Sequence, residues 1–157
     1  MLSGSMAMSV YTEPRYTRDF DFIIHLKPSD VLHLTEYFKE GYYYDQDSVI
    51  DAIKRSGQFN IIDHKSNYKA DFYILKNDEF EINKFERRIE IDYFGSKVFI
   101  ISVEDLLLSK LIWIQELQST LQVSDITQLS NLNDLDWTYI WTWIDRIKLN
   151  TFNLVKK

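Results

Sequence analysis

The sequence predicts a single α+β domain spanning residues 1–157, with a mixed β-sheet and its flanking helices in residues 1–102 and a helical part in residues 103–157. Short segments rich in β-branched and aromatic residues alternate with turns through the first part of the chain. Helical periodicity without strands then follows to the end. The length of 157 residues and the 45% hydrophobic content fit one domain with one core.

Three strands are expected in the first part of the chain. Residues 19–26 (DFDFIIHL) are apolar and β-rich, which predicts a central strand. Residues 59–62 and 69–75 predict two more strands, joined by a polar turn over residues 64–67. A hairpin is expected further on, with strands at 88–93 and 97–102 that turn at Gly95 and Ser96.

Short helices are expected between these strands. Residues 28–40 form an apolar helical stripe that starts at Pro28, a residue suited to a first helical turn, and ends before Gly41. Residues 47–55 predict a shorter helix, and residues 77–87 predict a short helix or a loop.

The helical part begins at Ser102, because Ser102 and Asp105 have the spacing of a capping box. A long amphipathic helix is expected from there to about residue 119, followed by helices near 125–132 and 135–148. Their apolar faces are expected to pack on the sheet or on one another, and carry Leu107, Leu111, Ile114, Trp137, Ile140, Trp141 and Ile144.

Composition excludes several classes of protein. The net charge of −6 argues against a protein that coats nucleic acid through a basic surface, although it allows an enzyme that holds one nucleotide through bound cations. The absence of Cys excludes disulfides, thiolate metal sites and a cysteine nucleophile. The apolar runs are too short to span a bilayer and no signal-peptide pattern is seen, so we expect a cytoplasmic protein without a membrane partner.

Asp19 and Asp21 are the first candidates for chemistry. Side chains alternate across a strand, so both carboxylates point to one face, with Cα atoms roughly 6–7 Å apart. Oxygen ligands in this arrangement suit Mg²⁺. Two exposed acids on the solvated face of an edge strand would give the same pattern, so the pair alone does not identify a site.

Three further features favour a site. Gly4 and Ser5 open a predicted helix, where backbone amides and a hydroxyl can approach a phosphate. Asp71 lies inside a predicted strand between Ala70 and Phe72, where a carboxylate is costly to bury without a partner or a metal. Lys110 lies on an otherwise apolar helix and can reach a phosphate as a point charge; the alternative is a lysine that packs its stem and extends its head to water.

These pieces, read as LSGS, then DFDF, then ADFY, resemble the signature of the polymerase-β-like nucleotidyltransferase superfamily. The segment LSGSMAMSVYTEPRYTRDFDFII resembles the corresponding segment of minimal bacterial nucleotidyltransferases, including toxins of abortive-infection toxin–antitoxin pairs. SVEDLLLSKLIW, followed by a Trp-rich helix, also looks like this group. The resemblance covers nearly the whole chain.

The resemblance implies a mixed-sheet nucleotidyltransferase fold and transfer of a nucleotidyl group from a nucleoside triphosphate, with release of pyrophosphate. It implies that Asp19 and Asp21 bind Mg²⁺ and the triphosphate, and that Asp71 is the third carboxylate. Gly4 and Ser5 would then hold the outer phosphates and Lys110 would steady them. The acceptor is open between tRNA, a protein side chain and a small molecule, and an antitoxin protein is a further expected partner.

Several positions keep a second interpretation. Gly4 and Ser5 would also fit a cloning remnant, or a chain whose first strand is cut short. Asp125 is interpreted first as a helix cap. Arg15 is preferred over Arg18 as a phosphate contact, because strand alternation places Arg18 opposite Asp19; pairing of Arg15 with a surface acid is equally open. The alternative function is a catalytically weak nucleotide-binding or protein-interaction module with the same fold.

Overall fold

The computed structural model describes residues 1–93 and 95–155. Within these residues one seven-stranded sheet has the order β3-β4-β5-β2-β1-β7-β6. The strands are β1 (Leu2–Ser3), β2 (Asp19–Ile24), β3 (Tyr42–Tyr44), β4 (Gln58–Asp63), β5 (Lys69–Ile74), β6 (Ile89–Tyr93) and β7 (Ser96–Ile100). The sheet is mixed: β2 is parallel to β5 and β1 is parallel to β7, whereas the other neighbouring pairs are antiparallel. The predicted α+β class is therefore confirmed.

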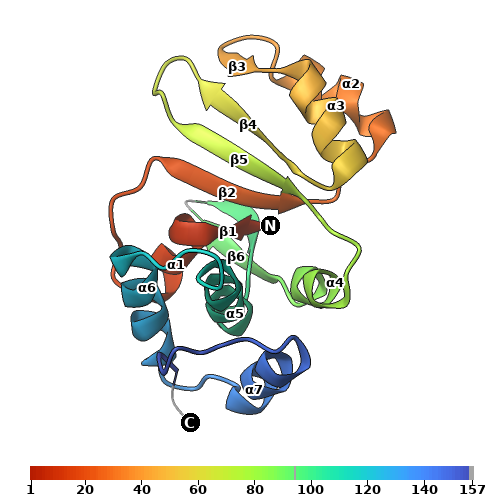
Figure 1. Ribbon diagram of the computed structural model, residues 1–157. Coiled ribbons are helices and arrows are strands. Elements are labelled where there is room, and N and C mark those ends of the chain that lie inside the picture. The colour runs from red at the N-terminus through yellow and green to blue at the C-terminus, as the bar shows by residue number, and fades with distance from the viewer. Residues whose placement is uncertain (94, 156–157) are drawn as a thin grey trace.

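Helices group at the two ends of the sheet (Figure 1). A 3-10 turn (Pro28–Asp30) and the helices α2 (Val31–Tyr37) and α3 (Gln46–Arg55) lie at the β3–β4 end. The other helices lie toward the β1 and β6 end and are α1 (Gly4–Tyr11), α4 (Glu79–Glu86), α5 (Val103–Trp113), α6 (Thr120–Ser130) and α7 (Trp137–Arg146). No helix of the described chain has both the length and the apolar composition needed to cross a membrane.

Two apolar clusters hold these groups in place. In the larger one, α1, α5, α6 and α7 pack with Leu2 of β1 and Ile100 of β7. All five aliphatic residues expected on the C-terminal helix faces are buried there, and Trp137 and Trp141 pack against them, so the predicted packing of the helical part is confirmed. In the smaller cluster, Val49 and Ala52 of α3 pack with Phe59 and Ile61 of β4 and with Ile74 of β5.

Polar caps set several helix starts. The side chains of Asp45, Asp78, Ser102, Ser119 and Asp136 each accept a hydrogen bond from a backbone amide in the first turn that follows. These bonds satisfy amides that have no partner inside the helix. The predicted start at Ser102 is confirmed.

Two boundaries in the helical part were predicted wrongly. The helix expected to run to about residue 119 ends at Trp113, and the one expected near 125–132 begins at Thr120. The cause is Ser119, whose hydroxyl accepts a hydrogen bond from the Gln122 amide at 3.2 Å and so begins α6. Asp125 therefore lies in the middle of a helix, and its interpretation as a helix cap is wrong.

The edge strand β3 was not predicted. It follows Gly41, which has a φ of +83°, and it pairs with β4 through Tyr42, Tyr43 and Tyr44. A strand this short takes its stability from its neighbour rather than from its own pattern. The helix expected over 28–40 is likewise shorter, because a 3-10 turn precedes α2 and the helix ends at Tyr37.

Asp105 is the centre of a buried polar network that joins three elements. Its carboxylate accepts hydrogen bonds from Ser102 Oγ at 2.6 Å, Arg87 Nε at 3.1 Å and the Tyr139 hydroxyl at 2.5 Å. Burial and the hydrogen bond to Asp105 raise the pKa of Tyr139, which keeps the phenol protonated as the donor. The network therefore fixes α5 against α7 and against the end of α4.

We expect Asp105→Ala to lower the free energy of unfolding by about 3–5 kcal/mol, because Ser102, Arg87 and Tyr139 lose the buried acceptor that they share. Arg87 keeps its pair with Glu104 at 3.4 Å and Tyr139 keeps its hydrogen bond to Asn83 at 2.7 Å. Urea unfolding followed by circular dichroism measures this change. Asp51→Ala is the matched control, since Asp51 is exposed and, among residues 1–93 and 95–155, its ion pair is with Arg55 at 2.9 Å. Exposed pairs of this kind contribute little. Equal stability of the two variants would contradict the assigned role of Asp105.

Candidate active site

The pairing of β2 with β5 brings the candidate acids to one face of the sheet. In the parallel register Asp21 lies beside Asp71, and Asp19 lies beside Lys69. Because side chains alternate along a strand, these four residues share a face. Phe20, Phe22 and Phe72 take the opposite face, where Phe22 and Phe72 stack with ring centroids 5.5 Å apart.

Lys69 lies between two of the three acids. Its Nζ is 2.8 Å from Asp71 Oδ2 and 3.6 Å from Asp19 Oδ1. Asp71 is buried and Asp19 is exposed. Within residues 1–93 and 95–155, no three Asp, Glu or His side chains are gathered closely enough to hold a metal ion by themselves. The strands thus align the three acids while an ammonium group occupies the space between Asp19 and Asp71.

Asp21 is the most electrostatically strained of the acids. Burial raises its pKa above the usual range, and the negative charges of Asp71 and Asp19 raise it further, against a smaller opposing effect of Lys110 and Lys69. Burial, Asp21 and Asp71 also raise the pKa of the nearby Tyr73 phenol to about 12. Asp71 and Asp19 therefore lie close enough to Asp21 to oppose its ionisation, which is typical of sites that bind cations.

Gly4 packs directly on Asp21. A Cβ atom at this position would lie 1.8 Å from Asp21 Oδ2, and the φ of Gly4 is +59°. Only glycine satisfies both the left-handed backbone and the close approach. Gly4 also begins α1, so the positive end of this helix and its free amides lie beside the carboxylate. The chain therefore turns from β1 into α1 at the acids.

A second set of charges lies beside the start of α1. Arg15 donates hydrogen bonds to Ser5 Oγ at 2.5 Å and to Asp125 Oδ2 at 3.2 Å. Lys110 donates to the same Asp125 oxygen at 2.7 Å. Lys110 also lowers the pKa of Asp21, which links this set to the carboxylates. Ser5, Arg15 and Lys110 were each proposed from the sequence for phosphate binding, and the fold brings them together.

Asp125 is the residue that joins this set, and sequence reasoning missed it. It is buried in α6, and its Oδ1 has no hydrogen-bond partner among the described residues; the same holds for Arg15 Nε. The spacing of Ser119 and Gln122 is that of a capping box and would have moved the predicted helix start to Ser119. Asp125 would then have fallen inside the helix rather than at its cap.

Lys69 was also missed, because it was not among the candidate residues selected from the sequence. Its position two residues before Asp71 in a strand was the available signal, because alternation puts both on one face. Arg18, the less favoured of the two arginines, lies on the surface and donates to the Tyr16 hydroxyl.

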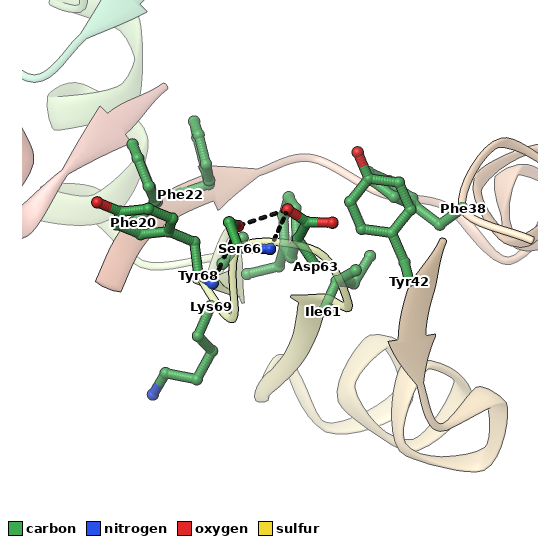
Figure 2. A pocket seen from close by; sticks show the side chains of 11 residues that line it. Phe20, Phe22, Phe38, Tyr42, Ile61, Asp63, Ser66, Tyr68 and Lys69 are labelled. Carbon is green, nitrogen blue, oxygen red and sulfur yellow. Dashed lines mark hydrogen bonds between the residues drawn. The ribbon is translucent and has the colours of Figure 1, made fainter. Parts of the chain in front are cut away.

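A pocket of about 550 Å³ lies on the opposite face of the sheet (Figure 2). Aromatic rings make up most of its wall, from Phe20, Phe22, Phe38, Tyr42, Tyr68 and Phe72. Lys69 borders the pocket, but its ammonium group points away from the rings, as Figure 2 shows. The sheet therefore separates this aromatic pocket from the carboxylates, and we do not assign it to the active site.

No protein-family model matches the sequence, and no curated protein matches it. Several solved structures share the fold, among them the following two. One is the lincosamide antibiotic adenylyltransferase LnuA with lincomycin bound, with a TM-score of 0.55 and 16% identity over 83% of this chain and 84% of that one. The other is an antigenic nucleotidyltransferase-like protein from Paracoccidioides brasiliensis, with a TM-score of 0.52 and 14% identity over 92% and 78% of the two chains.

The chain has a nucleotidyltransferase fold. The fold expected from the sequence is thus confirmed. At these identities the two structures say nothing further of this chain's activity, and the likeness to toxin-type members stays a prediction.

Proposed function

We propose that this chain is an Mg²⁺-dependent nucleotidyltransferase that transfers a nucleotidyl group from a nucleoside triphosphate to an acceptor and releases pyrophosphate. The observation that carries the proposal is the juxtaposition of Asp19, Asp21 and Asp71 on one face of the sheet with the start of α1 at Gly4. The acids suit a cation and the helix start suits a phosphate, and such transfer needs both.

Asp19, Asp21 and Asp71 are the residues that would hold Mg²⁺, and their chemistry fits it. Mg²⁺ prefers carboxylate oxygens together with substrate phosphates. Burial, followed by the negative charges of Asp71 and Asp19, raises the pKa of Asp21, and a divalent cation would offset the repulsion among these charges. Bound there, Mg²⁺ would neutralise charge that develops on the transferring phosphoryl group and on pyrophosphate.

Ser5, Arg15 and Lys110 would bind the outer phosphates of the nucleotide. Arg15 and Lys110 carry two positive charges against the single negative charge of Asp125, so the set keeps a net attraction for an anion. The Ser5 hydroxyl and the amides of the first turn of α1 add hydrogen bonds. Asp125 would hold both cations in place before the nucleotide arrives, which lowers the cost of ordering them on binding.

In the proposed reaction, an oxygen of the acceptor attacks the α-phosphorus in line with the bond to the leaving pyrophosphate. The new oxygen–phosphorus bond forms as that bond breaks, and the acceptor's proton passes to Asp71. The position of Asp71 next to Asp21, on the same face of the sheet, supports this role. Most of the rate enhancement would come from positioning and charge neutralisation, since no covalent intermediate is needed.

The acceptor is proposed as a small molecule, with tRNA and a protein side chain as the other classes. The similar structure with lincomycin bound is named as an adenylyltransferase of an antibiotic, which makes small molecules the first class to examine. The net charge of −6 disfavours extensive contact with RNA. The proposal also includes a role as a cytoplasmic toxin with an antitoxin protein as partner. In that case expression of the wild-type protein should arrest growth, and expression of Asp19→Ala/Asp21→Ala should not.

A catalytically weak nucleotide-binding module is the second candidate. The ammonium group of Lys69 between Asp19 and Asp71 favours it, because an unmoved lysine would prevent a metal ion from binding between these two acids. The two candidates differ in turnover and not in fold.

Label transfer distinguishes them. Purified protein, Mg²⁺ and each α-labelled nucleoside triphosphate are incubated with cell extract, and separately with a panel of hydroxyl-bearing antibiotics. We expect label in one acceptor class with the wild-type protein and none with Asp19→Ala/Asp21→Ala. Nucleotide binding without transfer to any acceptor would favour the binding module. Equal label transfer by the double variant and the wild-type protein would contradict the assignment of Asp19 and of Asp21 to the active site.

A further inference from the structure

Lys69 occupies a special position among the lysines of this chain. It lies two residues before Asp71 in β5, so both side chains are on the same face of the strand, and it lies beside Asp19 in the pairing of β5 with β2. Its Nζ contacts Asp71 Oδ2 at 2.8 Å and Asp19 Oδ1 at 3.6 Å. The ammonium group of Lys69 is therefore the positive charge that lies against Asp71 and Asp19.

This contact differs from an ordinary surface ion pair. The carboxylate of Asp71 is only 12% exposed, so its charge is largely removed from water and depends on Lys69 for compensation. Lys39 and Glu36, in contrast, form a pair 3.7 Å apart with both side chains more than half exposed. Such exposed pairs contribute little. Loss of the Lys69 charge would leave three mutually repelling carboxylates on one face.

Lys69 and a divalent cation cannot both occupy the space between Asp19 and Asp71. Mg²⁺ binds carboxylate oxygens at about 2.0–2.1 Å, closer than an ammonium nitrogen, and needs the same oxygens. The Lys69 side chain is 37% exposed and has a flexible four-carbon stem, so it has a path outward to water. Metal binding and the Lys69–Asp71 contact are therefore alternatives.

We propose that Lys69 is a resident cation that holds the three carboxylates together in the unloaded protein and leaves Asp71 when a divalent cation binds. The inference rests on the proposed function, because it concerns the same carboxylates. It adds a residue that lowers the affinity of the free protein for metal while stabilising the site in its absence. Lys69 is thus a positioning residue, and its removal should affect metal binding and stability in opposite directions.

Calorimetric titration of the nucleotide-free protein with Mn²⁺ tests the first part. We expect Lys69→Met to bind Mn²⁺ at least about tenfold more tightly than the wild-type protein, and Lys69→Arg to bind like the wild type, because the arginine restores the competing charge. Lys39→Met is the matched control and should leave the affinity unchanged. Equal Mn²⁺ affinity of Lys69→Met and Lys39→Met would overturn the inference.

Thermal unfolding tests the second part. In EDTA, Lys69→Met should melt below the wild-type protein, and Mn²⁺ should return most of this difference. A melting temperature that falls and is not recovered by Mn²⁺ would make Lys69 a structural residue only, and the inference would fail.

A measurement on the wild-type protein covers the case in which Lys69→Met does not fold. Lysines are acetylated briefly with and without Mg²⁺, and the extent at each residue is read by mass spectrometry. Mg²⁺ should increase acetylation of Lys69 and leave Lys39 unchanged; unchanged or reduced acetylation of Lys69 would overturn the inference. These readouts need no turnover, so a protein that binds metal as described but transfers no label would refute the proposed function alone.

Discussion

Replacement of Gly4 by Ala should abolish nucleotidyl transfer. Among the Gly→Ala substitutions possible in this chain, we expect this one to destabilise the protein most. The added Cβ would lie 1.8 Å from Asp21 Oδ2, so Asp21 or the turn into α1 must move. Displacement by about 1 Å at a reacting centre can cost 100-fold in rate. We expect transfer to fall by at least about 100-fold in the label assay.

Gly41→Ala is the matched control. Gly41 has the same kind of left-handed backbone, with a φ of +83°, but a Cβ there would meet nothing within 4 Å. Both variants carry the backbone strain of about 1–2 kcal/mol, and only Gly4→Ala carries the clash. Transfer by Gly41→Ala should equal that of the wild type.

A double-mutant cycle isolates the contact between Gly4 and Asp21. In the Asp21→Ala background Oδ2 and Cγ are absent and only Cβ remains, 2.9 Å from the added carbon, so Gly4→Ala should cost clearly less stability than it does in the wild-type background. If Gly4→Ala lowers the stability of the wild-type and Asp21→Ala proteins by the same amount, the close approach of Gly4 to Asp21 is not the reason that glycine is needed at position 4.

Replacement of Asp21 by Asn should remove transfer while stabilising the unloaded protein. The amide keeps the shape of the side chain but removes a negative charge that burial, Asp71 and Asp19 oppose. We expect at least about 100-fold lower transfer, the scale associated with loss of a charge-stabilising group. A gain of about 1 kcal/mol in stability corresponds to a rise of about 2–4 °C in melting temperature for a chain of this size.

The pH dependence of this gain follows from the direction of the pKa shift. The pKa of Asp21 is higher in the folded than in the unfolded protein, so the folded state is favoured by protonation of Asp21. That contribution is present in full below the unfolded pKa and is lost as the pH rises through the folded pKa. The advantage of Asp21→Asn should therefore be small near pH 4 and grow toward pH 7.

Asp45 provides a control of opposite sign. Hydrogen bonds from Ser48 and from the amides of Ser48 and Asp47 lower its pKa, so its contribution is present at neutral pH and is lost as the pH falls. Asp45→Asn should cost stability at pH 7 and progressively less toward acid. Parallel pH profiles for the two variants would contradict the electrostatic interpretation of Asp21.

Much of the sheet could be predicted because its strands follow local patterns. The alternation in residues 19–24 places Asp19 and Asp21 on one face, and the structure keeps that alternation. The neighbour of this strand could not be predicted in the same way, since the pairing of β2 with β5 joins residues about fifty positions apart and depends on the packing of the whole sheet. The position of Asp71 next to Asp21 therefore needed the structure.

Sequence patterns also identified single charges more readily than their partners. Lys110 and Arg15 were selected as candidate phosphate contacts, but the shared acid Asp125 was assigned to a cap because the start of α6 was misplaced. Lys69 was not selected at all, and its contact with Asp19 crosses strands. The contacts of Asp125 with Arg15 and Lys110, and that of Lys69 with Asp19, are tertiary, and no local pattern contains them.

Soaking crystals with Mn²⁺ and a non-hydrolysable α,β-methylene nucleoside triphosphate tests most directly whether these residues form a nucleotidyltransferase site. We predict an anomalous Mn²⁺ peak among Asp19, Asp21 and Asp71, and the triphosphate against Ser5 and Lys110. A nucleotide bound elsewhere, for example in the aromatic pocket on the opposite face, with no metal at Asp19 and Asp21, would contradict the assignment of the active site.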